Sequence, residues 1–171
     1  MAGSLIKLDE KIASGDASIT VGGSNWDSSY DVYMVKIFGL NPATSQVLRC
    51  RLTENGTDNT SNVYTYSAKG FKTTVGFENN NAVSSTYFDI SDSYVNATTG
   101  NFNAVMYIFG ANNSSEWTHI TFETSHYAGA ELYGNQGAGA LKVTSAVNGI
   151  TFYINAINID SGTFTLYGLK K

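Results

Sequence analysis

The sequence is poor in charge, in cysteine and in proline. Charged residues make up 14% of the 171 positions, and Cys50 and Pro42 are the only residues of their kinds. A single cysteine excludes an internal disulfide. The ten Lys and Arg residues are scattered, so no basic cluster is present to neutralise nucleic-acid phosphates. No apolar run approaches the ~20 residues that span a bilayer. We therefore expect neither a nucleic-acid nor a membrane partner.

The start of the chain lacks a basic segment followed by a long apolar one, so no secretory signal peptide is expected. With the unpaired Cys50, this predicts synthesis in the cytoplasm. Residues 46–52 alternate like a strand, which favours Cys50 as a buried core thiol over a reactive one. A reactive thiolate needs a basic partner. Arg49 and Arg51 flank Cys50 and keep that second interpretation open.

In place of charge the sequence has 18 Ser, 18 Thr and 17 Asn residues. These side chains solubilise a surface by hydrogen bonding and are common on extracellular β-proteins and particle coats. Helical periodicity is nearly absent, whereas strand-like runs recur between turn signals. The pattern predicts one all-β domain over residues 1–171, a single-domain antiparallel β-sandwich of the jelly-roll type with helix content below a tenth.

Some segments have a specific predicted structure. Alternation is strongest in residues 102–109 and 115–123. We expect a hairpin that turns at residues 68–70, a further turn at residues 78–81 and a glycine-rich loop over residues 127–139. In the run 30–40, Val32, Met34, Ile37 and Phe38 are expected to be buried. Pro42 is expected in a turn outside every strand.

The sequence contains no recognisable catalytic motif, and we expect no enzyme activity, no cofactor and no metal. Ser125 and His126 are neighbours, but neighbouring side chains on a strand point to opposite faces. The carboxylate pairs Asp89 with Asp92, and Glu116 with Glu123, have no accompanying groove signal and are interpreted as solvated or turn-capping acids. Oxygen ligands on loops, such as Asp58 with Asn59, lack the calcium-loop pattern.

Aromatic residues give the richer signal, with 11 Tyr, 9 Phe and 2 Trp. They can fill the core, form a protein interface or stack on sugar rings. Candidate interface residues are Leu5, Ile6 and Leu8 in a short N-terminal contact segment of about residues 1–10, and Leu132 and Tyr133 in the glycine-rich stretch. The alternative is a sugar platform made by Trp26, Tyr64, Tyr66 and Trp117.

Three segments resemble small virion proteins of tailed phages, many of them marine: MAGSLIKLDE at residues 1–10, VGGSNWDSSYDVY at 21–33 and NIDSGTFTLYGLKK at 158–171. The resemblance implies a non-enzymatic structural protein that is made in the host cytoplasm and decorates or cements the outer surface of the capsid. Its expected partners are the major capsid protein and further copies of itself, most simply a homotrimer. The alternative is a receptor-binding sugar module of a tail or fibre.

Overall fold

The computed structural model describes residues 4–74, 76–91, 93, 95, 97–98 and 101–170. Thirteen strands make up most of this part of the chain, and its one helical segment is the three-residue 3₁₀ turn η1, Gly23–Asn25. The expected low helix content is confirmed. The strands are β1 Ser4–Ala13, β2 Ser18–Gly22, β3 Val32–Pro42, β4 Leu48–Glu54, β5 Thr57–Asp58, β6 Tyr64–Lys72, β7 Phe77–Ser85, β8 Phe88–Asp89, β9 Phe102–Phe109, β10 Thr118–Ala128, β11 Glu131–Leu141, β12 Gly149–Ile154 and β13 Ile159–Lys170.

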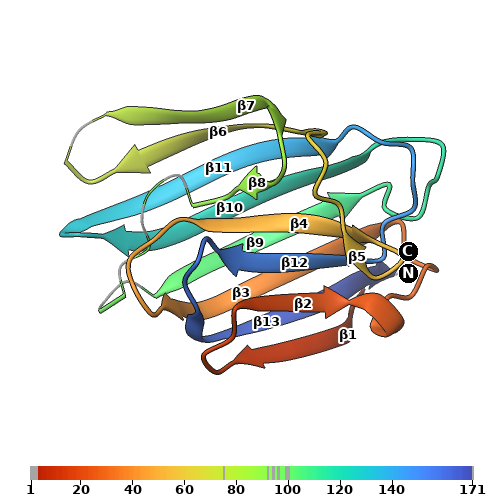
Figure 1. Ribbon diagram of the computed structural model, residues 1–171, viewed down its shortest axis with the longest axis horizontal. Helices are drawn as coiled ribbons and strands as arrows, with labels where there is room; N and C mark the ends of the chain where they lie inside the picture. The colour runs from red at the N-terminus through yellow and green to blue at the C-terminus, as the bar shows by residue number, and fades with distance from the viewer. Residues whose placement is uncertain are drawn as a thin grey trace.

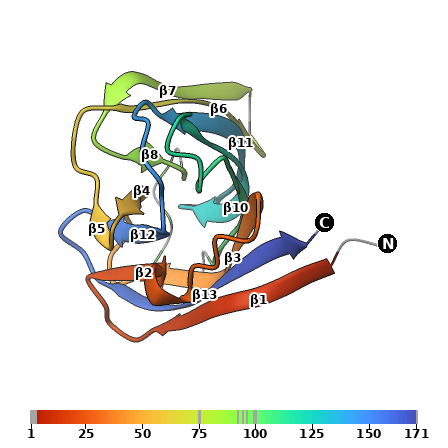
Figure 2. The ribbon, with the colours of Figure 1, turned by 90° about the vertical axis from the view of Figure 1, so that its right-hand side faces the viewer.

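The strands form two antiparallel sheets packed face to face, which confirms the predicted β-sandwich. The larger sheet has the order β1-β13-β3-β9-β10-β11-β6-β7 (Figure 1). The smaller sheet has the order β2-β12-β4-β5, with β8 paired to β4. The larger sheet curls around the smaller one (Figure 2). The first and last strands, β1 and β13, lie side by side, and the chain passes repeatedly between the sheets in the jelly-roll manner.

Alternating side chains build the core between the sheets. On β9, Phe102, Ala104, Met106 and Ile108 point inward, and their odd-numbered neighbours point outward. On β10 the even positions from Thr118 to His126 are buried and the odd positions are exposed. Because strand side chains alternate between faces, each run supplies one core row and one outer row. The alternation expected in these two runs is therefore confirmed.

Several predicted turns are wrong. Residues 68–70 lie inside β6, whose hairpin partner β7 includes residues 78–81, and the connection falls between Lys72 and Phe77. The expected glycine-rich loop is the end of β10 and the strand β11, which is paired on both sides. Glycine and asparagine residues suggested turns in these segments. Pairing with adjacent strands instead keeps the segments extended, because a sheet supplies hydrogen bonds to any residue with a backbone N–H.

Three predictions in the third strand are also wrong, and the first concerns Val32, which is only half-buried. Phe38 is exposed, because Ile37 faces the core and two consecutive strand residues cannot share a face. Pro42 is the last residue of β3 and is buried. Asn55 and Gly56 form a tight turn between β4 and β5, both with positive φ (51° and 77°), as an Asn-Gly hairpin turn requires.

Candidate functional site

The outer face of the eight-stranded sheet carries rows of side chains that cross the strands. Pairing places Lys36 of β3 beside Val105 of β9, Val105 beside Glu123 of β10, and Glu123 beside Gln136 of β11. The next row includes Met34, Tyr107, Thr121 and Ala138. Residues distant in sequence therefore meet on one surface.

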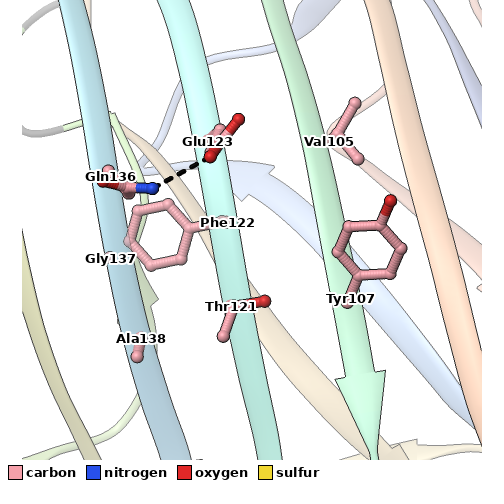
Figure 3. Close-up of a pocket in the computed structure, with 8 residues that line it drawn as sticks. All are labelled: Val105, Tyr107, Thr121, Phe122, Glu123, Gln136, Gly137 and Ala138. Carbon is pink, nitrogen blue, oxygen red and sulfur yellow. Dashed lines mark hydrogen bonds between the residues drawn. The ribbon is translucent and has the colours of Figure 1, made fainter.

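A hollow of about 820 Å³ lies over β9, β10 and β11 in these two rows (Figure 3). Tyr107 and Val105 line the β9 side, and Gln136 and Ala138 line the β11 side (Figure 3). The Tyr107 side chain is partly exposed, at 37%. The side chains of Thr121 and Ala138 are small, so they leave a depression in the surface beside the larger Tyr107 ring.

The polar side of this hollow is held in place by a hydrogen bond. The Gln136 amide nitrogen donates to a Glu123 carboxylate oxygen at 2.9 Å (Figure 3). A second hollow of about 390 Å³ shares Val105 and Glu123 with the first and extends to Phe38, Asn103 and Ser125. We call the two together the central trough. It presents aromatic rings near both ends, with amide, hydroxyl and carboxylate groups between these rings and the Lys36 ammonium beside the second hollow.

Apolar side chains gather at one end of the same outer face. Leu5 of β1 pairs with Leu169 of β13, and Val32 of β3 pairs with Phe109 of β9. These four residues are at least partly exposed, with Leu5 at 50%. Gly168 lies opposite Tyr33, which brings Leu169 next to Val32. We call Leu5, Val32, Phe109 and Leu169 the terminal patch.

A second apolar group lies at the opposite end of β10. Phe71 pairs with Phe77, and Tyr127 pairs with Leu132. All four are exposed. We call them the hairpin patch. Contiguous exposed apolar side chains on a folded domain mark an interaction surface more often than a solvated one.

The structure separates the predicted interface residues. Leu5 and Ile6 are exposed on β1, an edge strand, whereas Leu8 is half-buried and packs against the core. Leu132 belongs to the hairpin patch. Tyr133 points inward and stacks on His126, with ring centroids 5.7 Å apart. Leu132 and Tyr133 therefore point to opposite faces of the larger sheet. The sequence analysis could not predict this, because it placed both residues in a loop.

The four rings of the expected sugar platform do not share an open face. Tyr64 is fully buried and donates to the Asn59 carbonyl at 2.8 Å. Trp26 stacks on Tyr33 at 3.9 Å, and Tyr66 packs against the core near Phe88. Trp117 is 46% exposed and is the one open ring of the set.

The titratable residues that the sequence singled out lie in several different parts of the described structure. Burial lowers the pKa of His126 to about 4, and the Ser93 backbone offsets this only in part. Burial raises the pKa of the Cys50 thiol, and Asp89 and Asp58 raise it further. Glu116 lies outside the strands and Glu123 lies in the trough, while Asp92 falls outside the described residues. Within the described ranges, no three His, Cys, Asp or Glu side chains form a potential metal site.

The sequence did not indicate that Tyr107 and Gln136 are candidate site residues. The alternation in residues 102–109 did place Tyr107 with Val105 on one face. Nothing in the sequence shows that β10 lies between β9 and β11, and this pairing brings Tyr107, Glu123 and Gln136 together.

Comparisons with known proteins give little. No family model and no curated protein match the chain. One solved structure, an alginate lyase from Alteromonas sp. 272, aligns with 98% of this chain and 92% of its own at 10% identity and a TM-score of 0.19, a likeness too weak to support an argument. No helix within the described residues is long and apolar enough to cross a membrane.

Proposed function

We propose that this chain is a non-enzymatic structural protein of a tailed-phage particle, seated on the outer surface of the capsid and bound to the major capsid protein. The observation that carries the docking part of the proposal is the terminal patch beside the exposed edge strand β1. The resemblance of residues 1–10, 21–33 and 158–171 to phage virion proteins supports the choice of particle.

The terminal patch suits a protein partner. Leu5, Val32, Phe109 and Leu169 offer adjoining apolar area on four neighbouring strands. Burial of such area is the main favourable term in protein association. The abundant Ser, Thr and Asn side chains then supply a polar, hydrated rim around the apolar centre.

The edge strand adds a second mode of contact. β1 pairs with β13 along one side, and most of its side chains are exposed. An edge presents main-chain donors and acceptors to a strand of a partner. Leu5 belongs both to the start of this strand and to the terminal patch, so the edge and the patch form one docking region. Ile6, its neighbour on β1, points to the opposite face.

A homotrimer fits this role. Three-fold sites of a capsid lattice match a trimer without distortion, and three linked contacts bind far more tightly than one. The proposed partners are therefore the major capsid protein and two further copies of this chain.

The docking region is tested on particles from a phage that lacks the gene for this chain. We expect Leu5→Asp and Phe109→Asp to abolish occupancy, because each buries an uncompensated charge at the contact. Phe71→Asp, in the hairpin patch, is the matched control and keeps full occupancy. Full occupancy by both terminal-patch variants contradicts the proposed docking region.

A further inference from the structure

We infer that the central trough is a binding site for a neutral glycan chain. This inference goes beyond the proposed docking role and does not depend on it, since the trough is lined by residues outside the terminal patch. It also differs from the sugar platform expected from the sequence, whose residues do not line the trough.

The shape of the trough suits a chain rather than a single small molecule. It follows β9 from Tyr107 to Asn103, which at a rise of ~3.4 Å per residue corresponds to ~14 Å. The two hollows share Val105 and Glu123, so the trough is continuous between them. Its lining comes from the outer face of one sheet, so a chain bound there keeps one side open to solvent.

The lining matches the two kinds of surface that a sugar presents. The partly exposed Tyr107 ring offers an apolar face for the C–H face of a pyranose. Glu123 accepts hydrogen bonds, and Gln136 both donates and accepts them. Their mutual bond at 2.9 Å holds these planar groups in place before a ligand arrives, which lowers the ordering cost of binding. Thr121 adds a hydroxyl in the neighbouring row, opposite Tyr107.

Charge favours a neutral ligand. The lining of the two hollows holds one acidic side chain, Glu123, and one basic side chain, Lys36, so the trough carries no net charge. Phosphorylated or uronic-acid polymers would meet the Glu123 carboxylate where the two hollows join. A peptide bound by strand addition would instead need an open sheet edge, whereas β9, β10 and β11 are each paired on both sides.

The test measures binding of neutral oligosaccharides by titration calorimetry. The probes are hexamers of glucose in α- and β-linked forms and of N-acetylglucosamine, with an oligogalacturonate as the anionic comparison. We expect at least one neutral probe to bind and the oligogalacturonate not to bind. Tyr107→Ala and Gln136→Ala are each expected to weaken binding by about tenfold or more.

Two matched variants separate contact from folding. Tyr107→Phe keeps the ring and is expected to keep binding within about threefold. Tyr167→Ala removes another tyrosine of the same sheet outside the trough and is expected to bind as the wild type does. Circular dichroism and thermal unfolding confirm that each variant is folded. Absence of binding by every neutral probe, or binding that survives Tyr107→Ala and Gln136→Ala, overturns the inference.

Discussion

Cys50 lies at the centre of β4 with no exposed surface, opposite Phe152 of β12 and Phe88 of β8. The strand-like alternation around it had favoured a core thiol, and this prediction is confirmed. Burial raises the pKa of the thiol, which removes the thiolate needed for reactivity. The neighbouring Arg49 and Arg51 do not activate it, since their guanidinium groups lie over the rings of Tyr87 and Tyr153.

We expect Cys50 to react with dithionitrobenzoate only as the protein unfolds. Labelling of the native protein should be slower than labelling in denaturant by several orders of magnitude, because access requires opening of the core. Rapid stoichiometric labelling under native conditions contradicts this description of the thiol.

His126 is buried on β10 between Phe102 and Tyr133. Because burial lowers its pKa from 6.5 to about 4, the unfolded chain binds a proton between these pH values and the folded chain does not. The free energy of unfolding should therefore fall by up to about 3 kcal/mol as the pH drops from 6.5 to 4.

This dependence is measured by urea unfolding across that pH range. His126→Phe should reduce the fall in the free energy of unfolding between pH 6.5 and 4. His119→Gln, at an exposed position of the same strand, is the control and should show the same fall as the wild type. An equally steep curve in the His126 variant assigns the acid sensitivity to other groups.

At the level of the element, β11 shows why sequence pattern alone was insufficient. The glycine content of this segment predicted a loop. In the structure, the absence of side chains at these glycines lets aromatic rings of neighbouring strands pack against β11. A Cβ at Gly137 would come within 2.4 Å of the Phe122 ring and 2.7 Å of the Ala68 Cβ. A Cβ at Gly139 would come within 2.5 Å of the Phe88 ring and 2.9 Å of a main-chain oxygen. The need for glycine at these positions arises from contacts that only the folded chain makes.

We expect Gly137→Ala and Gly139→Ala to destabilise the protein by about 1–3 kcal/mol each, because the core rings must move in a packed interior. Gly134→Ala is the matched comparison. It meets only the Phe71 ring, which is half exposed and can turn away. Chemical unfolding measures the three variants, and equal losses at all three positions contradict this explanation.

The same limit applies to the candidate site. The period-two alternation of apolar and polar residues predicted which side chains of β9 and β10 point outward. The order of strands in the sheet could not be predicted, because pairing between β9, β10 and β11 depends on contacts across the whole sandwich. Tyr107, Glu123 and Gln136 become a site only through that order.

For the whole molecule, the proposed docking region and the proposed ligand site share the outer face of the larger sheet. Nine residue pairs join β1 to β13, so Ser4–Ala13 is an integral strand as well as part of the proposed docking region. Deleting residues 1–8 would expose β13 and disturb the fold. Point substitutions such as Leu5→Asp therefore test docking more cleanly than a deletion does.

The terminal patch, the central trough and the hairpin patch follow one another along the outer face of the larger sheet. The Tyr107 ring at one end of the trough lies 6.4 Å from the Phe109 ring of the terminal patch, whereas the hairpin patch lies at the far end of β10. The proposed attachment surface is therefore one end of the sheet, and the proposed ligand site is its middle.

We propose that this chain decorates a phage capsid, and quantitative mass spectrometry of purified mature particles measures its presence there. We expect the chain at a copy number comparable with that of the major capsid protein, and we expect it to be lost from particles when Leu5 and Phe109 are both replaced by Asp. Its absence from mature particles, or a copy number as low as that of a tail component, would exclude capsid decoration.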